Sequence, residues 1–226
     1  ENFIAEDQGG VIFVDCLESQ SQLSMGLVLR NVMFLNNVAL GLGGGALSLH
    51  NCKQVKLTEV TFESNFAPSG AGGALLASAS DLQIDTVVAF SNTAGGEDGG
   101  GAFRINGGSL TSNAGDGAAG VLSSLPLLNK CENNTALSPS GAGGACMILE
   151  YTSVNLIRWA LNGNHANLGG AIRCMGTSLG VISTVFHANT ADRDGGAVSG
   201  MLCEMTISET VFSENAAGVY KGFSGF

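Results

Sequence analysis

The sequence is poor in charged residues and poorest in basic ones. Charged side chains make up 12% of its 226 residues, with 9 Lys or Arg against 19 Asp or Glu and a net charge of −10. A protein that binds a nucleic-acid backbone needs clustered basic side chains to neutralise phosphates. The composition therefore excludes a basic nucleic-acid binder.

Long apolar runs and helical periodicity are also missing. The longest apolar runs are much shorter than the roughly 20 residues that span a bilayer, so the sequence encodes no transmembrane helix. No 3.6-residue periodicity is sustained, and 34 glycines exclude a coiled coil. A hydrophobic content of 45% is too high for a disordered chain. The class that remains is a glycine-rich, acidic all-β protein.

Two short motifs alternate along the chain, one of them Gly-Gly-Ala and the other ending in Asn. The Gly-Gly-Ala copies begin at Gly44, Gly72, Gly100, Gly143, Gly169 and Gly195. The Asn positions are Asn2, Asn37, Asn65, Asn92, Asn113, Asn134, Asn162, Asn189 and Asn215. A large apolar residue stands three positions before most of these Asn, namely Phe34, Phe62, Leu110, Trp159, Phe186 and Phe212. Self-similarity at such a period is typical of solenoids.

Apolar residues alternate with mixed ones between the motifs, which indicates strands with one buried face. After each Gly-Gly-Ala, the predicted inward column is Leu47, Leu75, Phe103, Cys146, Ile172 and Val198. The predicted outward column beside it is Ser48, Leu76, Arg104, Met147, Arg173 and Ser199. A unit of three short strands cannot bury its own face, whereas stacked units can. We therefore predict one right-handed, single-stranded parallel β-helix over residues 1–226, with about 8 coils of 21–28 residues.

Turn geometry accounts for both motifs. A bend between strands needs positive φ, which Asn tolerates, and Asn side chains stacked coil on coil can also bond to one another. Gly-Gly supplies positive φ at the next corner and admits close backbone approach.

The six cysteines form no Cys-x-x-Cys metal signature. Cys16 and Cys52 occupy nearly the same point of adjacent coils, which predicts a disulfide between them. Cys146 and Cys174 fall in inward columns and are predicted as buried thiols. The even count favours an oxidising compartment. Asn133 begins the sequon Asn133-Asn134-Thr135 and is a candidate glycosylation site.

No firm metal, cofactor or catalytic site emerges from the sequence. Asp98 and Asp116 are predicted at one corner of adjacent coils, where two carboxylates could hold Ca²⁺, although solvated loop charges are the favoured interpretation. A β-helical polysaccharide lyase or hydrolase needs carboxylates on neighbouring coils, and no predicted outward column carries consecutive Asp or Glu. His50, His165 and His187 occupy different places of the repeat and predict no triad. We therefore expect no enzymatic activity.

The motif pair resembles the passenger repeats of the polymorphic outer membrane proteins of chlamydiae, over nearly the whole chain. One family motif is matched by Gly44-Gly45-Ala46-Leu47, Gly169-Gly170-Ala171-Ile172 and Gly195-Gly196-Ala197-Val198. The other is matched by Phe34-Leu35-Asn36-Asn37, Phe62-Glu63-Ser64-Asn65, Phe186-His187-Ala188-Asn189 and Phe212-Ser213-Glu214-Asn215. The pattern departs from the family's between Gly101 and Cys131. The resemblance implies a surface-displayed β-helix whose motifs serve adhesion.

These observations predict a non-enzymatic, extracellular or cell-surface segment of a larger exported protein, with a structural or adhesive role. Because neither end carries a capping unit, we expect a longer chain. The expected partners are a cell-surface or glycan ligand. Two alternatives stay open: a filament subunit that stacks head to tail, and the scaffold of a carbohydrate-active β-helix. Core packing and turn geometry already explain the motif residues, so adhesion would use loops and outward columns.

Overall fold

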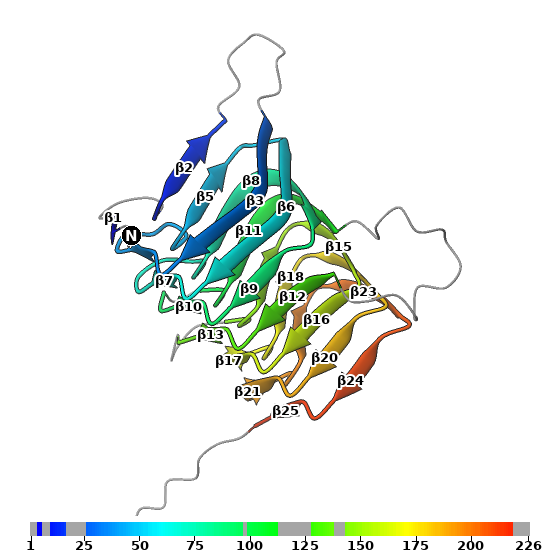
Figure 1. The fold of residues 1–226 in the computed structure, drawn as a ribbon. Coiled ribbons are helices and arrows are strands. Elements are labelled where there is room, and N and C mark those ends of the chain that lie inside the picture. Colours follow the sequence, from blue (N-terminus) through cyan, green and yellow to red (C-terminus); the bar gives the residue numbers. More distant parts are fainter. Residues whose placement is uncertain are drawn as a thin grey trace, which may run out of the picture.

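The structure is a parallel β-solenoid of about six turns, as the sequence predicts (Figure 1). This computed structural model describes residues 4–5, 10–16, 26–96, 99–112, 128–137 and 143–218. Every strand pairing in these ranges is parallel. The described part of the chain holds no helix that could cross a membrane.

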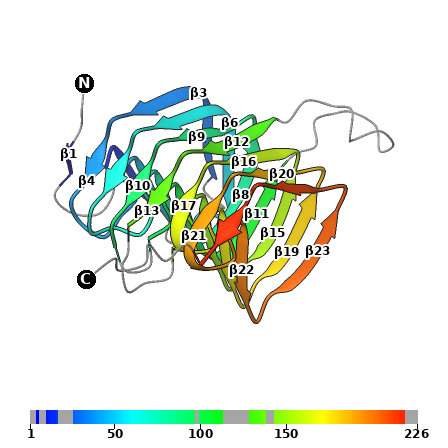
Figure 2. The ribbon, with the colours of Figure 1, turned by 90° about the horizontal axis from the view of Figure 1, so that it is seen from below.

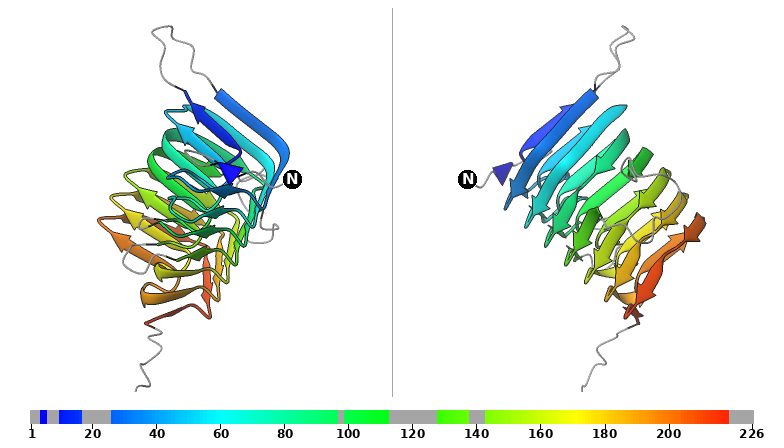
Figure 3. Two further views of the ribbon diagram at one scale, coloured as in Figure 1. Left: turned by 90° about the vertical axis from the view of Figure 1, so that its left-hand side faces the viewer. Right: turned by 45° about the vertical axis from the view of Figure 1, so that its right-hand side comes forward.

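Each turn contributes strand segments to four rows, and each row runs along the solenoid axis (Figures 2 and 3). The first row contains β2 (Ile12–Asp15), β5 (Leu47–His50), the first half of β8 (Leu75–Asp85), the first half of β11 (Phe103–Ser112), β14 (Met147–Glu150), β18 (Ile172–Met175) and β22 (Val198–Met201). The second row contains the first halves of β3 (Gly26–Leu35) and β6 (Gln54–Glu63), the second halves of β8 and β11, β15 (Ser153–Ile157), β19 (Ser178–Ile182) and β23 (Glu204–Ser208).

The other two rows complete each turn. The third row contains the second halves of β3 and β6, then β9 (Val88–Phe90), β12 (Asn129–Glu132), β16 (Trp159–Asn162), β20 (Val185–His187) and β24 (Val211–Ser213). The fourth row contains β1 (Ile4–Ala5), β4 (Val38–Ala39), β7 (Phe66–Ala67), β10 (Thr93–Ala94), β13 (Thr135–Ala136), β17 (His165–Leu168), β21 (Thr190–Asp194) and β25 (Ala216–Ala217).

Along each strand, every second side chain points into the solenoid, and these side chains form the core. Leu57, Phe62, Trp159 and Phe186 are fully buried there. Phe34 stacks on Phe62 with ring centroids 5.1 Å apart. Parallel in-register pairing places equivalent residues of successive turns above one another, so the period-2 alternation of the sequence becomes a continuous apolar interior.

An asparagine ladder runs the length of the described solenoid at the corner between the third and fourth rows. Its members are Asn37, Asn65, Asn92, Asn134, Asn164, Asn189 and Asn215. The Oδ1 of Asn164 accepts both the backbone N–H (3.1 Å) and the Nδ2 (3.0 Å) of Asn134. Its own Nδ2 donates to Cys131 O at 2.8 Å and to the Oδ1 of Asn189 at 2.9 Å. Each interior carboxamide therefore satisfies two donors and two acceptor sites.

The ladder corrects the predicted role of these asparagines in the backbone. The residue with positive φ is the one before each ladder member: Asn36, Ser64, Ser91, Asn133, Gly163, Ala188 and Glu214. The ladder Asn contributes side-chain hydrogen bonds. The preceding residue adopts the left-handed backbone conformation, and its side chain can point outward.

Two alignment errors follow from choosing the wrong Asn. Asn164 is the ladder member, not Asn162, so Leu161 lies opposite Phe186, and Trp159 does not occupy the Phe column. Leu110 pairs with Leu82 and Val154, which places it in the second row. Asn134 follows Asn92 directly in the ladder, so the two predicted 21-residue coils are one long turn, and about six turns replace the predicted eight. Asn2 and Asn113 lie outside the described residues.

The glycine corner carries a similar one-residue slip. Met147 pairs with both Phe103 and Ile172, so Met147 and not Cys146 occupies their inward column, and Cys146 lies buried one position before it. The outward position beside it belongs to Ile148, not Met147. Of the first glycines in the motifs, only Gly169 and Gly195 have positive φ. The more general reason for glycine at this corner is the close approach of the backbones of neighbouring turns. A β-carbon on Gly45, for example, would collide with the carbonyl oxygen of Gly73 in the next turn.

Three disulfides connect the six cysteines. Cys16 and Cys52 are bonded, with Cα atoms 4.9 Å apart, which is the pair that the sequence predicts. Cys131 bonds Cys146 and Cys174 bonds Cys203, with Cα–Cα distances of 5.9 and 6.3 Å. The prediction of buried free thiols at Cys146 and Cys174 is therefore wrong. It rested on their inward columns, which do not reveal that Cys131 reaches Cys146 across the interior or that Cys203, at the corner after β22, reaches Cys174 of the neighbouring turn.

The hydrogen bonds of the ladder predict the effect of an Asn164 substitution on stability, and the nearby Asn162 provides a control. Replacing Asn164 by Ala leaves the buried backbone N–H of Asn134 and one of its two Nδ2 hydrogens without an acceptor, while the Nδ2 bond to Ala89 O remains. At about 1–3 kcal/mol for each buried donor left unsatisfied, we expect a loss of about 2–6 kcal/mol. Asn162→Ala removes only a 3.2 Å bond to Glu132 on the outer side, and should change stability little. Thermal unfolding followed by circular dichroism compares the two variants, and equal shifts would contradict the ladder assignment.

Candidate binding groove on the outer face

The motif residues carried over from the family resemblance lie inside the protein. All residues of Gly44-Gly45-Ala46-Leu47 and Gly169-Gly170-Ala171-Ile172 are buried, as are Phe34, Asn37, Phe62, Asn65, Phe186 and Asn189. Gly195-Gly196-Ala197-Val198 is buried or half-buried, and among the Phe and final Asn positions of the second motif only Phe212 in the last described turn is exposed. Buried residues cannot contact a ligand, so these motifs build the scaffold, and any binding must use outward side chains and corners.

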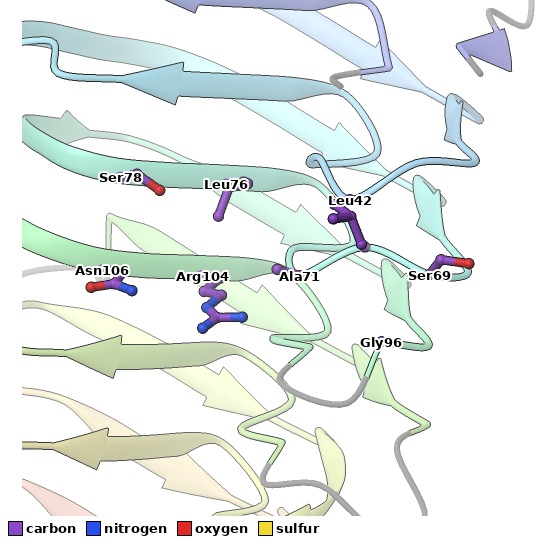
Figure 4. Close-up of a pocket in the computed structure, with 9 residues that line it drawn as sticks. Leu42, Ser69, Ala71, Leu76, Ser78, Gly96, Arg104 and Asn106 are labelled. Atoms are coloured by element: carbon purple, nitrogen blue, oxygen red, sulfur yellow. The ribbon is translucent and has the colours of Figure 1, made fainter. Parts of the chain in front are cut away.

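A groove lies on the outer side of the first row, beside the glycine corners (Figure 4). Its floor is formed by outward side chains of β8 and β11, and its wall by the corners that contain Leu42, residues 69–71 and Gly96. The cavity volume is about 440 Å³. This volume falls within the range of about 300–1,000 Å³ that is typical of small-molecule sites.

The floor has a regular chemical layout because of the strand register. Leu76 pairs with Arg104, and Ser78 pairs with Asn106, so two outward columns cross the groove in parallel. Ser78 and Asn106 form a polar column, whereas Leu76 and exposed Leu42 provide apolar surface. The leucine side chains can therefore contact one face of a ligand, while the polar column forms hydrogen bonds with the edge of that ligand.

Arg104 is held in place by an ion pair with Glu150 on the next turn. The Nη2 of Arg104 lies 2.8 Å from the Oε2 of Glu150, and the two side chains are only 17% and 10% exposed. A charge-assisted hydrogen bond at this distance is short and directional. The guanidinium therefore presents a fixed donor edge with its charge already compensated.

Histidines at the opposite corner have neighbours that the sequence did not reveal. His165 Nδ1 lies 2.9 Å from Thr190 Oγ1 and its Nε2 lies 3.7 Å from Asp192. His187 lies between Ser213, at 3.0 Å, and Glu214, at 3.8 Å. Both imidazoles are nearly half-exposed, and their distances to the carboxylates exceed a hydrogen bond. These groups are solvated surface contacts and lack the close base–orienter hydrogen bond of a catalytic triad.

The remaining predicted sites have different outcomes. Asp98 and Asp116 lie outside the described residues, so the calcium hypothesis stays a prediction. Within the described ranges, no three His, Cys, Asp or Glu side chains gather as a metal site. Asn133 is exposed at a corner with φ of 54°, beside the buried Asn134, so its side chain is accessible for the predicted glycosylation.

The slip at the glycine corner concealed the Arg104–Glu150 pair, whereas Leu76 and Arg104 of the groove floor were aligned correctly. It placed Met147 beside Arg104, whereas Ile148 occupies that position and Asn106 pairs with Glu150. With the register shifted by one residue, Glu150 moves off the outward face, and its proximity to Arg104 disappears. An alignment counted back from the ladder residue Asn164, instead of from Asn162, would have placed Glu150 on the outward face.

The Arg104–Glu150 pair predicts a non-additive effect on stability. Removing either partner alone leaves a nearly buried charge, so Arg104→Ile and Glu150→Met should each destabilise by about 1–3 kcal/mol. The double variant should recover most of that loss, because Ile148 and Met175 already occupy the same two columns one turn further along. A double-mutant cycle of unfolding free energies measures the coupling. Additive losses would show that the pair is not formed.

The chain is without close relatives in the comparisons with known proteins. No protein-family model, curated protein or solved structure matches it significantly. The likeness to chlamydial passenger repeats therefore remains a prediction from the motifs, and the assignment of the solenoid fold comes from the structure of this chain.

Proposed function

We propose that this chain is a non-enzymatic structural or adhesive segment of an exported protein, displayed outside the cell. The observation that carries the proposal is the set of three disulfides, which use all six cysteines. Disulfides form and persist in oxidising compartments, and thiols in the cytosol are kept reduced.

The positions of the disulfides suit a rod that must resist unfolding. Cys16–Cys52 and Cys174–Cys203 connect neighbouring turns near the two ends of the described solenoid. Cys131–Cys146 crosses the interior where the Phe column has no aromatic ring. A solenoid gains stability only from contacts between adjacent turns. A covalent link between two turns therefore opposes their separation in an environment without chaperones.

The outer face supports an adhesive role. The core and ladder residues that hold the turns together are buried, so the outward columns can vary without loss of the fold, and the groove beside β8 and β11 is one such surface. Function then resides in the surface that the scaffold carries, as is common for binding loops on rigid folds.

The test combines a disulfide map with surface labelling of the producing cells. We expect non-reducing peptide mapping to recover the pairs Cys16–Cys52, Cys131–Cys146 and Cys174–Cys203. A membrane-impermeant amine reagent should label exposed Lys53 and Lys130 on intact cells. Free cysteines together with no labelling would overturn the proposal. Beads coated with the chain separate the two roles, because an adhesive segment binds cells saturably and a purely structural one does not.

End-to-end association is the second candidate, favoured by the last described turn. Met205, Ile207 and Phe212 are 39%, 45% and 47% exposed, whereas their equivalents Leu179, Val181 and Phe186 are buried. Asn215 is the last ladder member in the described part of the chain, and its Oδ1 accepts from Asn189. A further turn of the same kind would cover the apolar row and extend the ladder, and in this second candidate function another molecule supplies it.

Sedimentation velocity over a concentration series tests this association. We expect the sedimentation coefficient to rise with concentration for the unmodified chain, and Ile207→Lys to abolish that rise because a charge at a strand edge opposes stacking. Val28→Lys is the control, since Val28 is 63% exposed on the outer face of β3. A coefficient that does not change with concentration would rule out stacking.

A further inference from the structure

We infer that the groove beside β8 and β11 binds a neutral saccharide of one or two rings. The inference rests on the proposed adhesive function and names the ligand class for it.

The groove is a rigid feature of the scaffold. Its floor strands are each paired on both sides, β8 with β5 and β11, and β11 with β8 and β14. Its wall depends on Gly70 and Gly96, where a β-carbon would meet the carbonyl oxygens of Gly43 and Gly70 respectively. A preformed site avoids the entropic cost of ordering loops around a ligand.

The lining matches the mixed surface of a sugar ring. Leu42 is 72% exposed and lies across the groove from the polar floor, with Leu76 between them (Figure 4). These two side chains can cover the C–H face of a pyranose. Ser78 and Asn106 both donate and accept hydrogen bonds, and Arg104 donates from a fixed position. Hydroxyl groups also do both, which makes a polyhydroxylated ligand the best complement.

The electrostatics favour a neutral ligand over an acidic one. Among the described residues that line the groove, Arg104 is the charged one, and its charge is compensated by Glu150 at 2.8 Å. The chain carries a net charge of −10, which repels anions at long range. A nucleic acid or a sulfated polysaccharide is therefore disfavoured.

The backbone also disfavours an extended peptide. Peptides that bind sheets usually add a strand to a free edge, where main-chain hydrogen bonds supply the affinity. The floor strands β8 and β11 have no free edge, because their backbone groups bond to the turns on either side. A ligand in the groove must therefore be recognised by side chains alone.

The experiment uses the disulfide-bonded chain on an array of oligosaccharides of one to four rings, both neutral hexose and N-acetylhexosamine types and acidic sialyl and uronate types. The strongest neutral hit is then titrated by calorimetry. Ser78→Met fills the floor of the groove, and we expect it to weaken binding at least tenfold. The fold accepts Met in this column, as Met175 and Met201 show. Met175→Ser, outside the groove, is the matched control and should bind like the unmodified chain.

Glu150→Gln separates neutral from acidic recognition. It removes the compensating charge from Arg104, so it should tighten binding of an acidic sugar and should not tighten binding of a neutral one. Exclusive binding of acidic sugars, or a neutral hit that Ser78→Met leaves unchanged, would overturn the inference. An array without hits would also overturn it. Saturable cell binding by coated beads in that case would show that the adhesive function stands with a ligand of another class.

Discussion

The asparagine ladder is the interaction on which the rest of the structure depends. Each interior carboxamide, as at Asn164, bonds to the backbone and side chain of the turn before it and to the side chain of the turn after it. Because the carboxamides are buried and all their hydrogen-bonding groups are used, a slip of one residue would leave several buried polar groups unpaired. The ladder thus fixes the register between turns, and the register in turn creates every column of the solenoid.

Once the register is fixed, the interior tolerates considerable variation. The Phe column runs Phe34, Phe62, Ala89, Cys131, Leu161, Phe186 and Phe212. Stacked rings fill it near both ends, with centroids 5.1 Å apart for one pair and 4.7 Å for the other. In the middle, Phe103 from the first row meets Phe62 edge to face, and the Cys131–Cys146 bridge replaces a ring. Side chains from different rows therefore compensate for one another across the narrow core, and the motif need not be perfect.

The same register separates the scaffold from the surface. Residues that repeat most regularly are buried, and those that vary most, such as Leu76 and Arg104 in one outward column, line the groove. Chemistry on the outer face comes from neighbours in adjacent turns rather than neighbours in sequence. Arg104 and Glu150 are far apart in the chain, yet form a 2.8 Å ion pair. This organisation explains how a repetitive chain can carry a local, non-repetitive site.

The sequence by itself determined the fold class, because alternation, glycine corners and a recurring Asn leave parallel stacking as the way to bury one face of each strand. It also determined the Cys16–Cys52 pair, which needs only neighbouring turns. Tertiary structure decided what depends on register at single-residue precision. Asn162 and Asn164 are both spaced acceptably in sequence, and only Asn164 has carboxamides above and below it. The Cys131–Cys146 and Cys174–Cys203 bridges and the groove depend on which side chains from different rows or turns meet in space, which a linear alignment does not give.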